Sequence, residues 1–147
     1  MKKAVLDSNV LVSAIYRPES VPGQVLQRGH QQAYELWLSR GILRETRKTL
    51  RDRPFFAKQI TDEQRERFLK ALRRAFPTVQ RIRRGRYVPR DRKDDHVVGA
   101  ALAAEADYLV TGNVRHLIVL DPLEARGQVI RIISPRDFLD LLEETEE

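Results

Sequence analysis

The sequence predicts an α/β fold in which one parallel sheet is covered by helices on both faces. Short apolar segments typical of strands alternate with segments of helical periodicity, an order that favours parallel strands joined by helices. A length of 147 residues suits one domain with a single core. No linker, internal repeat or low-complexity tract divides the chain. We therefore expect a single α/β domain over residues 1–147.

Helix start and stop signals divide the first half of the chain. Pro18 ends the first helix, because the residue before a proline disfavours helical conformation, and Pro22 suits the first turn of the second helix. Ser39 is a good N-cap for the third helix. Thr61 and Gln64 form a capping-box pattern at the start of the fourth helix. The strands expected here span 3–7 and 33–38, and the helices span 10–16, 23–27, 41–51 and 62–76.

The second half continues the alternation after a basic loop. Its last helix has Ser134 as N-cap and Pro135 at the first helical position, where a missing N–H costs nothing. The strands expected here span 78–82, 107–111 and 129–133, and the helices span 94–104 and 135–144.

The composition limits the chemistry and suggests a polyanionic partner. A net charge of +6 and a pI near 10.0 favour association with nucleic acid. Much of the positive charge lies in the loop before the helix at 94–104, at Arg81, Arg83, Arg84, Arg86, Arg90, Arg92 and Lys93. The chain has no cysteine, which excludes disulfides, thiolate metal sites and cysteine nucleophiles. Its three histidines show no paired ligand spacing, so a metal ion here would have oxygen ligands, which suit Mg²⁺ or Mn²⁺.

No part of the sequence directs the chain to or through a membrane. The first apolar stretch is interrupted by Asp7, too early for a signal-peptide core. No apolar run approaches the roughly 18 residues of a membrane span. We therefore expect a cytoplasmic protein with no membrane partner.

Two acidic positions, Asp7 and the pair Asp94 and Asp95, lie where a ligand-binding site is expected. Asp7 follows the first strand, and ligands of parallel α/β sheets bind outside the carboxyl ends of the strands. Residues of a helix are about 100° apart, so Asp94 heads the apolar stripe that continues through Val97, whereas Asp95 lies on its flank. A carboxylate leading a buried face is costly unless a positive charge meets it. The alternative is that Asp94 or Asp95 only caps the helix, although two consecutive acids need only one cap.

Glu45 and segment 111–113 become candidates for the site only if they lie close to these acids. Glu45 lies at the border of the apolar stripe of its helix, and by itself it would be an ordinary surface glutamate. Thr111, Gly112 and Asn113 follow the strand 107–111, where small polar residues often form a turn. The amide oxygen of Asn113 is able to coordinate a cation or orient water, but it adds no charge.

These residues, in this order, resemble a PIN domain, the small nuclease fold that includes VapC-type ribonuclease toxins of toxin-antitoxin pairs. The resemblance covers nearly the whole chain, and its last block is similar to a toxin subfamily. The blocks that carry it are 5–14, 42–50, 91–98, 106–113 and 133–139.

The resemblance implies a three-layer α/β/α fold and a metal-dependent endoribonuclease, the toxin of a type II pair with a small antitoxin and a homodimeric state. The implied ligands for Mg²⁺ or Mn²⁺ are Asp7, Glu45 and Asp94, with Asp95 as the alternative to Asp94. Asn113 joins the catalytic group, and Ser8, Asn9 and Thr111 support it. The sequence departs from the family at its fourth acidic position, where relatives have an aspartate in place of Asn113 or His116. Asp121 either compensates or forms a turn before Pro122.

The basic loop leads directly into Asp94, so it is expected to contact the phosphates of RNA through Arg84, Arg86, Arg90, Arg92 and Lys93. The alternative is a solvated loop. Tyr87, within this loop, is the best candidate for stacking on a base. Two other functions stay open: a PIN-like module that binds RNA or protein without cleavage, and a receiver-like phosphotransfer protein built on Asp7. The latter lacks a second acid two residues after Asp7 and a clear lysine after a late strand.

Overall fold

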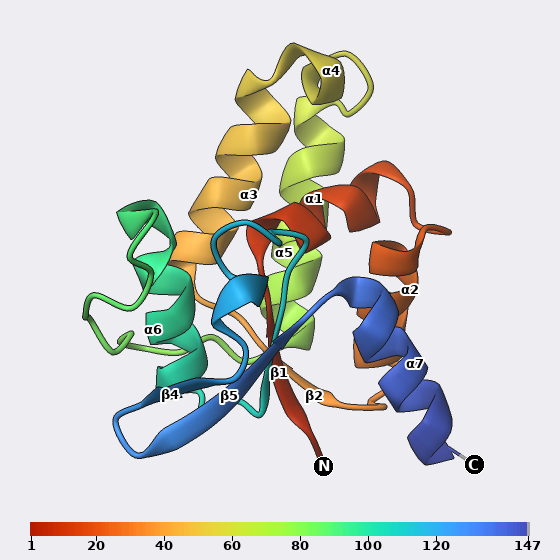
Figure 1. Cartoon of the computed structure of the whole chain (residues 1–147). Coiled ribbons are helices and arrows are strands. Elements are labelled where there is room, and N and C mark those ends of the chain that lie inside the picture. Colours follow the sequence, from red (N-terminus) through yellow and green to blue (C-terminus); the bar gives the residue numbers. More distant parts are fainter. Residues whose placement is uncertain (147) are drawn as a thin grey trace.

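The computed structural model describes residues 1–146, in which five strands form one sheet of order β2-β1-β3-β5-β4 (Figure 1). The strands are β1 (Lys3–Leu6), β2 (Glu35–Trp37), β3 (Tyr108–Val110), β4 (Leu123–Ala125) and β5 (Gln128–Ile133). Strands β2, β1, β3 and β5 are parallel, and Val5 in β1 pairs with Trp37 in β2 and Leu109 in β3. Only β4, at the edge, is antiparallel to its neighbour among the described strands. The predicted α/β fold with a parallel central sheet is confirmed, with this antiparallel edge added.

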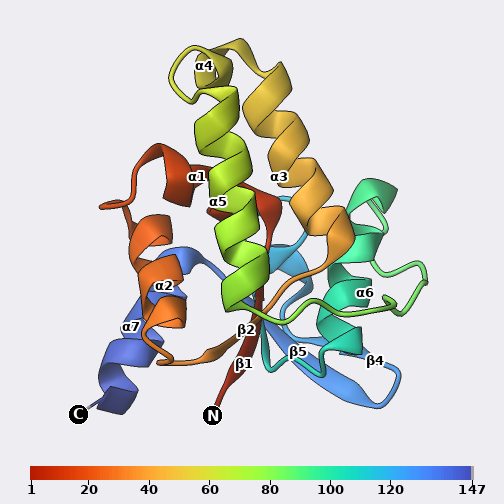
Figure 2. The same ribbon diagram turned by 180° about the vertical axis from the view of Figure 1, so that it is seen from behind.

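Helices cover both faces of the sheet. They are α1 (Ser8–Tyr16), α2 (Val21–His30), α3 (Arg40–Asp52), α4 (Pro54–Ala57), α5 (Asp62–Ala75), α6 (Asp95–Ala103) and α7 (Pro135–Glu146). Helix α6 lies on one side of the sheet and α1, α2 and α7 on the other, while α3, α4 and part of α5 extend beyond the carboxyl end of β1 (Figures 1 and 2). In residues 1–146 no helix combines the length and the apolar character that crossing a membrane requires.

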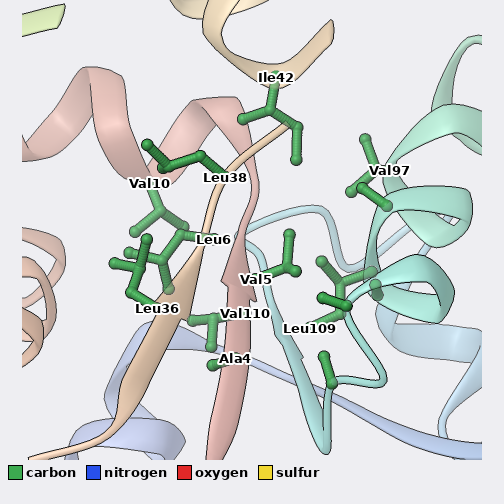
Figure 3. Close-up of a cluster of buried hydrophobic side chains, with 14 of the residues drawn as sticks. Ala4, Val5, Leu6, Val10, Leu36, Leu38, Ile42, Val97, Leu109 and Val110 are labelled. Carbon is green, nitrogen blue, oxygen red and sulfur yellow. The ribbon is translucent and has the colours of Figure 1, made fainter. Parts of the chain in front are cut away.

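Alternating side chains of the strands fill the two halves of the core. Leu6, Leu36 and Val110 lie together with Val10 of α1, whereas Val5 and Leu109 lie toward Val97 of α6 (Figure 3). This division follows from the two-residue period of a strand. Parallel strands covered on both faces are apolar at every position, which explains the uninterrupted run from Ala4 to Leu6.

The predicted helix caps are confirmed. Ser39 Oγ accepts a hydrogen bond of 3.1 Å from the amide of Ile42 at the start of α3. Thr61 and Gln64 form the expected capping box, with bonds of 2.8 and 3.1 Å. The apolar stripe of α3 is buried, which turns Glu45 toward the border of the helix surface.

The structure corrects several predicted elements. The segment 78–82 is not a strand, because only Thr78 pairs, through an isolated parallel bridge with Leu38. Beyond it the backbone leaves the sheet and crosses α6, where Arg83 bonds to Gly99. Helix α4 and strand β4 were not predicted, because they are too short for a periodic pattern. Helix α6 begins at Asp95, after a 3₁₀ turn η1 (Arg92–Asp94).

Candidate active site

Asp7 lies at the carboxyl end of β1, beside the end of β3. Its amide donates a 2.9 Å hydrogen bond to the carbonyl oxygen of Val110, so the two strand ends are held together. Its side chain caps α1 by accepting a 2.8 Å bond from the amide of Ser8. Only 4% of Asp7 is exposed to solvent. The residue is therefore fixed in the crevice where ligands of parallel sheets bind.

Polar neighbours fix the orientation of the Asp7 carboxylate. Thr111 Oγ1 donates a 2.8 Å hydrogen bond to Asp7 Oδ2, and Asn9 Nδ2 donates one of 3.2 Å to the same oxygen. Asn9 also accepts a 3.0 Å bond from the amide of Gly112, which connects α1 to the segment after β3. Ser8, Asn9 and Thr111, the residues expected to support the site, all contact the Asp7 carboxylate.

Burial makes the charge of Asp7 costly. It raises the pKa of Asp7 above 3.8, the hydrogen bonds from Thr111 and Ser8 oppose this, and the nearby charge of Glu45 raises the pKa further. Within residues 1–146 no cationic side chain forms an ion pair with Asp7. A buried carboxylate with no paired cation is the environment that a bound metal ion stabilises.

Asp94 brings a second carboxylate to the same place. It ends η1 and precedes α6, and its side chain is 15% exposed. Asn113 Nδ2 donates a 3.0 Å hydrogen bond to Asp94 Oδ2. Burial and the negative charges of Asp7, Asp91 and Glu45 raise the pKa of Asp94 to about 6. Carboxylates that raise the pKa of one another favour a divalent cation between them.

Asp95 has a different environment from Asp94. Its Oδ1 atom accepts hydrogen bonds of 2.9 and 2.8 Å from the amides of Tyr87 and Val88. These bonds tie the middle of the basic loop to the first turn of α6. The two aspartates therefore have different surroundings, as their positions around the helix predicted. Asp94 lies near the other acids, whereas Asp95 accepts hydrogen bonds from backbone amides.

Glu45 of α3 meets His96 of α6 at the edge of this group. His96 Nε2 lies 2.8 Å from Glu45 Oε1, and this proximity raises the pKa of His96 although burial opposes it. Glu45 Oε1 and His96 Nδ1 are buried without a well-directed hydrogen bond in residues 1–146. An under-satisfied carboxylate oxygen retains lone pairs for a metal ion.

A second group of potential ligands was not predicted from the sequence. Atoms of Asp91, Asp94 and His116 lie within 4.8 Å of one another. His116 Nδ1 is 3.5 Å from Asp91 Oδ2 and 3.9 Å from Asp94 Oδ2. Asp94 therefore belongs to this group and also lines the same hollow as Asp7. The signal in the sequence was that His116 occupies a position where relatives have an acid, but Asp91 had none.

Two hollows adjoin the acids. The first, here called the acidic hollow, has a volume of about 330 Å³, and its lining includes Asp7, Asp94, Asn113 and Arg53. The second, here called the arginine cleft, has a volume of about 910 Å³ and is lined by Glu45, His96 and six arginines, namely Arg40, Arg44, Arg81, Arg83, Arg84 and Arg126. Of the residues expected to bind RNA, Arg84 lines the arginine cleft, whereas Arg86, Arg90, Arg92 and Lys93 are exposed outside both linings.

The remaining candidates have structural partners. Asp121 does not compensate for the missing acid, because it accepts bonds of 2.9 and 3.1 Å from Arg131 and one of 2.7 Å from the amide of Ile132. Asn113 accepts a 3.0 Å bond from the amide of His116 while it donates to Asp94. The hydroxyl of Tyr87 is bonded to Arg83 and Arg126 and its ring is partly buried, which leaves little surface for stacking on a base.

A comparison with protein families matches residues 3–115 to the PIN domain. The chain belongs to the PIN domain family. The match includes Asp7, Glu45, Asp94 and Asn113, and it ends before β4, β5 and α7. PIN domains are generally metal-dependent nucleases, and the acidic group described above suits that chemistry. A search of curated proteins found no match.

Proposed function

We propose that this PIN domain is a metal-dependent endoribonuclease that hydrolyses phosphodiester bonds of RNA. The observation that carries the proposal is the convergence of Asp7, Glu45 and Asp94 from three elements of the fold, with the pKa values of Asp7 and Asp94 raised by burial and by neighbouring acids. Such a cluster is costly to the protein alone and is suited to hold Mg²⁺ or Mn²⁺. A bound divalent cation supplies Lewis acidity that activates water and offsets charge on the phosphate.

Each residue of the candidate active site has a proposed task. Asp7, Glu45 and Asp94 would hold the metal, and Asp91 and His116, which lie close to Asp94, would extend the ligand group. Ser8, Asn9 and Thr111 keep the Asp7 carboxylate in one orientation. Asn113 orients Asp94 through its 3.0 Å hydrogen bond. Among the described residues, Arg53 is the only cationic one that lines the acidic hollow, and its proposed task is to bind the phosphate.

Cleavage of a mixed pool of single-stranded RNA by purified protein tests this function. We expect cleavage with Mn²⁺ and none with EDTA, and loss of cleavage in Asp7→Asn and Asp94→Asn. Asp140→Asn, which removes an exposed carboxylate on α7, is the matched control and keeps activity. Metal-dependent cleavage that survives both active-site substitutions rejects the site. RNA binding with no cleavage under any metal favours the non-catalytic module.

The biological role that we propose is the toxin of a type II toxin-antitoxin pair, acting in the cytoplasm as a homodimer and inhibited by a small antitoxin. Support comes from the ordered resemblance to VapC-type toxins, which continues to residues 133–139. Growth arrest on expression, relieved by a small protein encoded beside this gene, tests the role. Light scattering tests the dimer. Unimpaired growth during expression of a demonstrably active nuclease contradicts the toxin role.

A further inference from the structure

The arginine cleft lies next to the acids but is built from different parts of the chain. Its walls come from α3, from segment 79–84 and from the turn between β4 and β5, and Glu45 and His96 belong to its lining. Among the residues that the structure describes, Glu45 is the only carboxylate in that lining. Since Glu45 is one of the three acids of the candidate active site, the cleft opens beside the acidic centre formed by Asp7, Glu45 and Asp94.

Within residues 1–146, five of the six arginines of the cleft have no side-chain partner. In the described part of the chain, the side chains of Arg40, Arg44, Arg81, Arg83 and Arg84 form no ion pair or hydrogen bond. All five residues are exposed. Guanidinium groups that outnumber the neighbouring carboxylates repel one another, and their planar donors match phosphate oxygens.

The backbone of the basic loop is held firmly beneath these side chains. The amide of Arg83 donates a 2.9 Å bond to the carbonyl of Gly99 in α6, and a Cβ atom on Gly99 would lie 2.6 Å from the Arg83 carbonyl oxygen. Glycine is therefore required where the loop crosses α6. Arg126, in the turn between β4 and β5, also bonds to the loop. Its Nη2 atom donates a 2.7 Å hydrogen bond to the Arg84 carbonyl, and its Nε atom donates one of 2.9 Å to the hydroxyl of Tyr87.

We propose that the arginine cleft binds the sugar-phosphate backbone of single-stranded RNA beside the acidic centre, and that Arg126 is a positioning residue that holds the loop in the binding shape. The proposal rests on the proposed ribonuclease function for its choice of RNA. A positively charged groove that follows a backbone is the usual site for single strands. An acidic peptide fits less well, because within residues 1–146 the lining contains only two large apolar side chains, Val79 and Ile82, to serve as anchors. Arg126 lies outside the residues matched to the family.

Binding of a fluorescein-labelled single-stranded RNA of mixed sequence, measured by anisotropy in EDTA, tests the cleft. The variant Arg40→Ala/Arg44→Ala/Arg81→Ala is expected to bind at least about tenfold more weakly and to lower the salt dependence of the affinity by about 2, since each phosphate contact contributes about 0.7. The control Lys58→Ala/Lys70→Ala/Arg73→Ala removes the same charge from exposed positions outside the cleft. Equal weakening in both variants overturns the proposal. So does tighter binding of poly-glutamate than of RNA to the wild type.

Arg126→Lys separates positioning from charge. Lysine keeps the charge but cannot make both bonds of the guanidinium fork. If Arg126 holds the loop, Arg126→Lys weakens RNA binding as much as Arg126→Ala does, and hydrogen exchange at the amides of residues 83–88 becomes faster. RNA affinity and exchange rates like those of the wild type in Arg126→Lys overturn the positioning role.

Different experimental results would contradict the RNA-binding cleft and the ribonuclease function. If the wild type never cleaves RNA but the triple arginine variant loses RNA binding, the nuclease function falls and the binding cleft stands. If the wild type cleaves RNA and the triple variant binds and cleaves equally well, the cleft falls and the nuclease function stands.

Discussion

His96 Nε2 lies 2.8 Å from Glu45 Oε1, and the imidazole ring reaches this position because residue 41 is glycine. Gly41 lies one turn before Glu45 on α3. A Cβ atom on Gly41 would lie 2.8 Å from His96 Nδ1, which is closer than side chains approach in proteins. Groups that orient a metal-ligating carboxylate strongly affect metal affinity. Gly41 and His96 are therefore expected to act together on Glu45.

Gly41→Ala is expected to displace the imidazole and weaken Mn²⁺ binding by about tenfold, within the range of losses for residues that orient metal ligands. The helix itself tolerates alanine well. Isothermal titration of Mn²⁺ measures the effect, with thermal unfolding as the check on folding. His96→Ala and the double variant complete the cycle: once the ring is removed, Gly41→Ala has no further effect. Additive losses in the double variant contradict the coupling.

Asp7→Asn is expected to separate stability from activity. Because burial raises the pKa of Asp7, removing its charge relieves a cost in the metal-free protein. The unfolding temperature in EDTA should be no lower than that of the wild type, whereas stabilisation by Mn²⁺ disappears and cleavage falls by more than about a hundredfold. Differential scanning calorimetry with and without Mn²⁺ measures this. Strong stabilisation of the variant by Mn²⁺ rules out Asp7 as a ligand.

The metal-free protein is expected to lose stability as the pH rises from about 4 to about 6. The usual pKa of an aspartate, 3.8, applies to Asp94 in the unfolded chain, and in the fold its pKa is raised to about 6. Between these two pH values the folded protein therefore holds a proton that the unfolded chain releases. Above the window the charged Asp94 costs at most about 3 kcal/mol. The raised pKa of His96 extends the loss to higher pH. Thermal unfolding in EDTA should show a smaller fall for Asp94→Asn, and identical pH profiles for the two proteins refute the assignment.

The fold could be predicted because its main elements have strong local signals. The uninterrupted apolar run at Ala4–Leu6 and the caps Ser39 and Thr61 carry their information within a few residues. Segment 78–82 was predicted to be a strand, but only its first two residues bond to the sheet, through Leu38, and the chain then crosses α6 at Arg83. The close passage at Gly99 that decides its path depends on packing between distant parts of the chain.

The site was only partly accessible from the sequence. Asp7 and Asp94 could be identified from a strand end and a helix phase, but Glu45 needed the family pattern. Asp91 and His116 are in contact although they are 25 positions apart in the sequence. Arg126 bonds to Tyr87 and Arg84, which precede it by 39 and 42 positions. No periodicity of the sequence predicts such contacts. The sequence shows that the loop is basic, but it does not show which arginines line a cleft together with α3. That choice depends on the path of the backbone across α6.

His116 is expected to favour Mn²⁺ over Mg²⁺. Imidazole nitrogen suits transition metals, whereas Mg²⁺ prefers oxygen ligands, so a group of Asp91, Asp94 and His116 binds Mn²⁺ more tightly. His116→Asp should narrow the difference between the two metals by improving Mg²⁺ binding. Titration of both metals, followed by calorimetry, measures the ratio of their affinities. An unchanged ratio in His116→Asp excludes His116 from the metal site.

Asn113→Asp is expected to have opposite effects with and without metal. Asn113 Nδ2 donates a 3.0 Å hydrogen bond to Asp94 Oδ2, and an aspartate would replace this donor with a second negative charge. Like charges at this distance destabilise the metal-free fold and raise the pKa of Asp94 above about 6. A divalent cation converts that repulsion into additional ligation, so Mn²⁺ should stabilise the variant more than the wild type. Unfolding temperatures across a Mn²⁺ titration test both effects, with Asn113→Ala as the control that removes the donor without adding charge. If Asn113→Asp and Asn113→Ala respond alike to Mn²⁺, then residue 113 lies outside the reach of the metal.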